Sequence, residues 1–86
     1  MSKRLLWQKG CPHCPTAKSM LASLIDAGEV TLTEVTDDSP VLDQNIADKF
    51  GGIPTLVEET EERVCEINIE TGERLKCLPR KELEGE

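Results

Sequence analysis

The chain alternates short apolar runs with stretches in which apolar residues recur at helical spacing. Residues 4–7 form an apolar run closed by a Gly-Cys-Pro breaker, which is the pattern of a buried strand. From Cys14 onward, the spacing predicts one amphipathic helix of about three turns that ends at Gly28. The residues on its predicted apolar face are Ala17, Met20, Leu21, Leu24 and Ile25.

Further elements follow after Gly28. Residues 30–35 alternate apolar and polar side chains, which predicts a strand. Residues 41–50 predict a second helix, with Ser39 as its N-cap and Pro40 at its first position. Three more strands are predicted at 53–57, 64–69 and 74–78, and one or two helical turns at 79–84.

The last two predicted strands form a hairpin. Glu70-Thr71-Gly72 is a plausible three-residue loop in which Gly72 supplies the left-handed residue. In that register Cys65 lies opposite Cys77, where Cβ atoms are ~4.5 to 5.5 Å apart, near enough for a disulfide after small adjustment. Two βα units followed by a hairpin predict an α/β sandwich, with the first two strands parallel and the last two antiparallel.

Composition limits the classes of function. The 86 residues suit a single domain, 1–86, and 17 acidic against 10 basic residues give a net charge of −7, which argues against nucleic-acid binding. The acids crowd into residues 58–62 and the tail after Glu82, and are interpreted as a solvated face and a frayed end. No membrane-length apolar run and no signal-peptide core is visible, so a soluble, cytoplasmic monomer is expected.

In a cytoplasmic protein, the spacing Cys11-x-x-Cys14 favours redox or metal chemistry over a structural disulfide. Disulfide exchange needs one exposed thiolate and a second thiol close enough to attack the mixed disulfide. We assign Cys11, in the strand-to-helix turn, as the nucleophile and the more shielded Cys14 as the resolving thiol, with no bound cofactor. Pro15 argues for a helix that starts there and not at Pro12, which leaves open which sulfur the helix dipole favours.

Three neighbours are candidates for tuning the thiolate. His13, between the cysteines, stabilises a thiolate if it is protonated or donates a hydrogen bond, and Lys9 adds positive charge. Pro12 is the third candidate. The alternatives are an exposed, uncoupled histidine and a merely solvated lysine.

Two segments carry a family resemblance. Lys9-Gly10-Cys11-Pro12-His13-Cys14, followed by Ala17-Lys18 and Leu21, resembles the active-site segment of glutaredoxins and small glutaredoxin-like thioredoxins; Gly52-Ile53-Pro54-Thr55-Leu56 is the second match. The resemblance implies a thioredoxin-like βαβαββ(α) sandwich, a central mixed sheet with helices on its faces. It also implies a cis Pro54 beside Cys11, and an Ile53 backbone that pairs with a bound substrate chain.

The resemblance also implies partners. These are disulfide-containing protein substrates and an electron donor, either a thioredoxin-reductase-like enzyme or another dithiol. Residues 61–65 do not match the Gly-Gly-x-x-Asp-Asp type segment of glutathione-binding glutaredoxins. Cys-Pro-His-Cys resembles the motif of the periplasmic DsbA oxidants, although no inserted helical domain accompanies it here.

Two alternatives remain open at this point. One is a metal module, in which Cys11, His13 and Cys14, with or without Cys65 and Cys77, hold zinc or bridge an iron–sulfur dimer. The eleven residues between Cys65 and Cys77 are more than a zinc knuckle uses. The other is a non-catalytic interaction domain with the same fold. The state of the second pair is also open, and it is a structural disulfide, two buried thiols or a second exchange pair.

Overall fold

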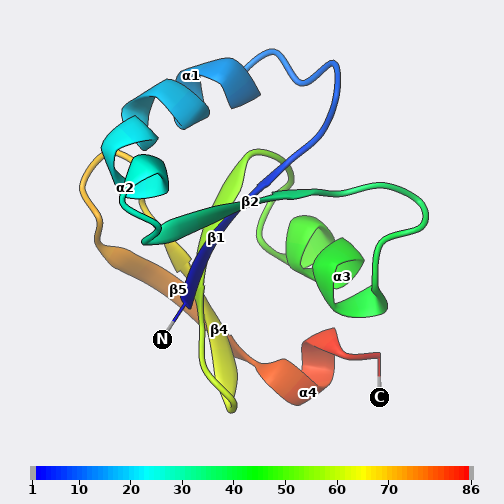
Figure 1. Ribbon diagram of the computed structural model, residues 1–86. Helices are drawn as coiled ribbons and strands as arrows, with labels where there is room; N and C mark the ends of the chain where they lie inside the picture. The colour runs from blue at the N-terminus through cyan, green and yellow to red at the C-terminus, as the bar shows by residue number, and fades with distance from the viewer. Residues whose placement is uncertain (1, 86) are drawn as a thin grey trace.

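A computed structural model of the chain describes residues 2–85. Within them, five strands form one mixed sheet and four helices pack against it (Figure 1). The strands are β1 (Ser2–Trp7), β2 (Val30–Glu34), β3 (Thr55–Glu59), β4 (Arg63–Ile67) and β5 (Arg74–Pro79). The helices are α1 (Cys14–Met20), α2 (Ala22–Asp26), α3 (Val41–Lys49) and α4 (Arg80–Leu83). The predicted α/β class is confirmed.

The sheet has the strand order β2-β1-β3-β4-β5. The first two strands are parallel, and the pairs β1/β3, β3/β4 and β4/β5 are antiparallel, as the sequence pattern predicts for the first and last pairs. The five strands are one more than the βαβαββ(α) order contains. The fifth is β5, which corresponds to the strand predicted at 74–78 and pairs with β4 as the returning arm of the hairpin.

The core has two apolar clusters, one on each side of the sheet. Alternation along β1 sends the neighbours Leu5 and Leu6 into different clusters. One cluster lies under α3 and α4 and contains Leu6, Val35, Ile46, Phe50, Val57, Val64 and Leu83. The other lies under α1 and the turn that follows it and contains Leu5, Ala17, Leu21, Val30, Leu56 and Ile67. Helices therefore cover both faces of the sheet (Figure 1).

The first predicted helix is divided in two at Leu21, which ends α1 and precedes α2. Leu21 is buried in the core, whereas Met20 is 48% exposed, so the prediction that both lie on the buried face is wrong for Met20. Adjacent residues are about 100° apart around a helix, and a narrow buried face holds only one of them.

The predicted cap of the second helix is also wrong. Pro40, not Ser39, occupies the N-cap position, and α3 begins at Val41. The Ser39 hydroxyl is used in the preceding turn, where it accepts a hydrogen bond from the Thr36 amide at 2.8 Å and donates to the Glu34 carbonyl at 3.4 Å. It is therefore not available to the first amides of α3.

The β4–β5 hairpin has the predicted register at its second cysteine pair. Cys65 lies opposite Cys77, their Cα atoms are 4.0 Å apart, and the two are joined by a disulfide, one of the three states left open by the sequence. The predicted three-residue loop is wrong, because β4 ends at Ile67 and β5 begins at Arg74, but Gly72 has φ +79°, the left-handed conformation expected of it. Closer to the loop the register shifts, so that two residues of β5, Leu75 and Lys76, lie opposite one residue of β4, Glu66, which is a bulge.

The Cys65–Cys77 disulfide is expected to stabilise the domain. A bond that closes a loop of sequence separation 12 contributes about 3 kcal/mol in the chain-entropy estimate. Cys65→Ala/Cys77→Ala should lower the free energy of unfolding by about that amount, measured by urea denaturation of the oxidised proteins. The difference should largely vanish in dithiothreitol, because the wild-type protein then lacks the bond as well. A difference below about 1 kcal/mol without reductant would contradict a stabilising role.

The acidic segment 58–62 is not a solvated face throughout. Glu58 and Glu59 belong to β3; Glu58 pairs with Arg74 at 3.0 Å, and Glu59 is buried in ion pairs with Arg4 and Arg80. In the tail, Glu84 pairs with Arg80 at 3.3 Å, while the last residue lies outside the described residues. The interpretation of these acids as wholly solvated is therefore wrong, because three of them neutralise arginines.

Arg4 is the centre of the buried part of this network. Its guanidinium donates to Glu59 from Nε and to Asp43 at 2.7 Å from Nη2, which joins β1 to β3 and α3. Burial by itself lowers the pKa of Arg4, but the hydrogen bonds to the Asp43 and Glu59 carboxylates outweigh it and raise the pKa above its ordinary value. Arg4 is therefore a permanently charged group between two carboxylates.

Candidate functional site

The Cys11-x-x-Cys14 segment lies where β1 leads into α1. The strand ends at Trp7, and Gly10 adopts φ +79° in the connecting turn. The Cys11 amide donates to the Gln8 carbonyl and the Cys14 amide donates to the Cys11 carbonyl, both at 3.4 Å. The turn holds Cys11 just before the helix and places Cys14 as its first residue.

The two cysteines differ in accessibility. Their Cα atoms are 5.4 Å apart and their sulfur atoms lie at disulfide distance. Cys14 is 2% exposed, whereas Cys11 is partly exposed. A substrate therefore reaches Cys11 more easily than Cys14, which is the asymmetry that the nucleophile and resolving roles require.

The helix starts later than Pro12. His13 stands at the N-cap position without a side-chain cap, and Pro15 falls in the first turn of α1. The Ala17 amide donates to the His13 carbonyl at 3.1 Å, and Pro15 has no amide hydrogen. In the first turn of α1, the Thr16 amide has no backbone acceptor among the described residues.

The three predicted tuning residues are all exposed. Lys9, Pro12 and His13 surround Cys11 in sequence. Within residues 2–85 neither the His13 imidazole nor the Lys9 ammonium forms a hydrogen bond or an ion pair. Their effect on the thiolate stays a prediction.

A contact that the sequence analysis missed joins the last turn of α1 to β1. The Lys18 Nζ atom lies 3.6 Å from the centroid of the Trp7 ring, which is a cation–π contact between the first helix and the end of β1. The signal was present in the sequence, because Trp7 is the only tryptophan of the chain and ends the strand that leads to the motif. That Lys18 is the partner of Trp7 depends on how α1 packs against β1, which the sequence does not show.

The Ile53–Pro54 segment lies at the same end of the sheet as the cysteine motif (Figure 1). Leu6 pairs with Thr55 across the β1–β3 ladder, so continuing the register by one residue brings Trp7 beside Pro54. The Ile53–Pro54 peptide bond is cis, as the resemblance implied. The Thr55 hydroxyl donates to the Gly52 carbonyl and ties the start of β3 to the turn that follows α3.

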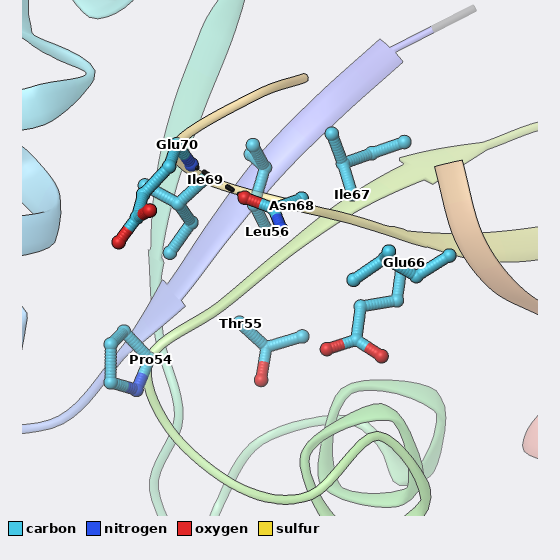
Figure 2. A pocket seen from close by; sticks show the side chains of 9 residues that line it. Pro54, Thr55, Leu56, Glu66, Ile67, Asn68, Ile69 and Glu70 are labelled. Atoms are coloured by element: carbon cyan, nitrogen blue, oxygen red, sulfur yellow. Dashed lines mark hydrogen bonds between the residues drawn. The ribbon is translucent and has the colours of Figure 1, made fainter. Parts of the chain in front are cut away.

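Two open hollows flank this segment. One, of about 290 Å³, begins at Pro54 and runs along β3 to the β4–β5 hairpin (Figure 2). The other, of about 330 Å³, includes Ile53 and Gln8 together with Asp37 and Asp48. None of the described residues that line these two hollows is a cysteine, so neither hollow contains the Cys11–Cys14 pair.

The structure joins the four cysteines in two separate pairs. Among residues 2–85, no group of three or more His, Cys, Asp or Glu side chains is arranged to hold a metal ion. The zinc site that uses all four cysteines is therefore not assembled here. No helix in the described part of the chain has the length and apolar character needed to span a bilayer.

Comparisons of the chain with protein-family models, curated proteins and solved structures give no match. Function is therefore inferred from the residues and geometry of the chain itself.

Proposed function

We propose that this protein is a thiol–disulfide oxidoreductase of the thioredoxin-like fold that exchanges disulfides with protein substrates through Cys11 and Cys14. The observation that supports it most strongly is the asymmetric pair at the β1–α1 junction. One sulfur belongs to a partly exposed residue, the other to a residue that is 2% exposed, and the two lie within bonding distance of each other. Such a pair can alternate between dithiol and disulfide without rearranging the fold.

The reaction proceeds in two exchange steps. The Cys11 thiolate attacks one sulfur of the substrate disulfide; that S–S bond breaks and the leaving sulfur takes up a proton. Cys14 then loses its proton and attacks the Cys11 sulfur, which releases the second substrate thiol and forms the Cys11–Cys14 disulfide. Two electrons and two protons pass to the substrate, and the reverse sequence oxidises a dithiol.

The surroundings of Cys11 favour its anionic form. The free amide of Thr16 lies in the first turn of α1, the helix that follows Cys11. His13 and Lys9 add positive charge when protonated. These groups make Cys11 the nucleophile even though Cys14 is the residue inside the helix.

The substrate chain lies along the Ile53–Pro54 segment in this proposal. The peptide backbone of Ile53 offers hydrogen-bonding groups to an extended substrate, and Pro54 keeps that strand end beside the motif. The protein works in the cytoplasm as a monomer without a bound cofactor. Its electrons come from a thioredoxin-reductase-like enzyme or from another dithiol.

A redox titration tests the proposal. Purified protein is equilibrated in dithiothreitol or glutathione buffers, and free thiols are counted in wild type, Cys11→Ser and Cys65→Ala/Cys77→Ala. We expect a two-electron transition that survives in Cys65→Ala/Cys77→Ala and is lost in Cys11→Ser. A potential near about −270 mV indicates a reductant and one near about −120 mV an oxidant. If no transition depends on Cys11, and the wild type does not catalyse reduction of insulin by dithiothreitol, the proposal is wrong.

A further inference from the structure

The hollow beside Pro54 is built mostly from one hairpin. Three of its nine lining residues belong to β3 or precede it, and the other six lie between Cys65 and Cys77, inside the loop that their disulfide closes. Those six are Glu66, Ile67, Asn68, Ile69, Glu70 and Leu75. The wall is held in place by the disulfide at one end and by Asn68 at the other, whose Oδ1 accepts the amides of Glu70 and Thr71.

One large apolar side chain of the hollow lies mostly outside the core. Leu75 is 53% exposed, one of the most exposed large apolar side chains among the described residues. It lies in the segment of β5 where the register shifts, so the bulge changes the regular in-and-out alternation at this point. Ile69, which also packs against the core, and Pro54 are partly buried and extend the apolar lining toward the start of β3.

The charged residues that line the hollow are both acidic. Glu66 and Glu70 form no ion pair with any described residue, whereas the partly buried carboxylates of Asp43, Glu58 and Glu59 are each paired with an arginine. Figure 2 shows the Glu66 carboxylate on the same side of the sheet as Thr55, beside the start of β3. An apolar hollow with unpaired carboxylates is complementary to an apolar side chain next to a cation.

We propose that this hollow docks the segment of a substrate protein that flanks its reactive cysteine, and that it selects segments in which an apolar residue is followed by Lys or Arg. The apolar side chain packs on Leu75 and Ile69, and the cation pairs with Glu66 or Glu70. Pro54 lines the hollow and directly precedes Thr55, which pairs with Leu6 of β1, the strand that leads into the cysteine motif. This inference rests on the proposed function, because the segment is recognised as part of a disulfide substrate.

The test uses two synthetic peptides that differ only in the residues after a Cys-Leu sequence, Lys-Lys in one and Glu-Glu in the other. Each cysteine is blocked as a mixed disulfide with 2-nitro-5-thiobenzoate, whose release is coloured. Reduced wild type, Glu66→Gln/Glu70→Gln and the control Glu61→Gln/Glu62→Gln are compared by kcat/KM, with dithiothreitol regenerating the Cys11–Cys14 dithiol and the rate without protein subtracted. The control removes two negative charges from the exposed turn before β4, outside the hollow, so it measures the effect of net charge alone.

We expect wild type and control to prefer the basic peptide by about five- to tenfold, the effect of one or two partly exposed ion pairs. The preference should fall close to one in Glu66→Gln/Glu70→Gln, through KM and not kcat. Equal rates with both peptides in wild type, or an equal loss of preference in the control, would overturn the docking proposal while exchange through Cys11 stands. Failure of wild type to release the chromophore from either peptide would overturn the proposed function itself.

Discussion

Cys14→Ser is expected to abolish turnover and to trap the substrate on the protein. Cys11 still attacks the substrate disulfide, but the mixed disulfide then waits for an external thiol, since the neighbour that resolves it is gone. Turnover of insulin reduction should fall at least about a thousandfold, because millimolar external thiol replaces a sulfur of far higher effective concentration. Mass spectrometry under non-reducing conditions should find the adduct on Cys11.

Cys11→Ser is the matched control for this experiment. It removes turnover as well, but it should form no adduct, because Cys14 is 2% exposed and a protein disulfide does not reach it. The Cys65–Cys77 disulfide stays oxidised in both variants, so any adduct that is detected has formed on a cysteine of the β1–α1 junction. An adduct on Cys14 in the Cys11→Ser protein, at a rate near that of the Cys14→Ser trap, would reverse the assignment of the two thiols.

The features that could be predicted from sequence are those that short-range rules determine. The left-handed Gly72 and the pairing of Cys65 with Cys77 were both expected from the hairpin pattern, although a bulge between this pair and the loop contributes to the final register. The spacing of Cys11 and Cys14 at the end of an apolar run is equally local. For these residues, the conformation is determined mainly by neighbours within about a dozen positions along the chain.

The missed features depend on which elements meet in space. Arg4 pairs with Asp43, which is 39 positions away in the sequence, and with Glu59, which is 55 positions away. Nothing in the acidic segment distinguishes Glu59, which is buried, from Glu61, which is exposed. The Ser39 hydroxyl was misassigned because two nearby backbone sites compete for it, and propensity does not rank them.

The candidate site also combines features that the sequence predicts with features that it does not predict. The identity and order of the two thiols follow from the motif, but the hollow beside Pro54 requires that β3, β4 and a bulged β5 lie together. The bulge exposes Leu75, which the sequence pattern treats as an ordinary strand residue. The roles of His13 and Lys9 depend on side-chain orientation, which the residue type does not determine.

Arg4→Met is expected to be strongly destabilising. The substitution keeps much of the apolar stem but leaves the Asp43 and Glu59 carboxylates buried side by side, with side-chain exposures of 10% and 9%. The remaining cation, Arg80, lies 3.6 Å from Glu59 and does not contact Asp43. Removing one partner of a buried charge pair costs about 3 to 5 kcal/mol, more than the Cys65–Cys77 disulfide contributes. Urea denaturation of the oxidised protein measures the loss.

Arg74→Met provides the matched comparison, because it makes the same substitution in an ion pair at the surface. The Arg74 side chain is 47% exposed, and its pair with Glu58 is worth no more than about 1 kcal/mol. Adding Asp43→Asn and Glu59→Gln to Arg4→Met should recover part of the stability, since the leftover groups then carry no charge. If Arg4→Met costs no more than Arg74→Met, the network joining β1, β3 and α3 does not stabilise the fold.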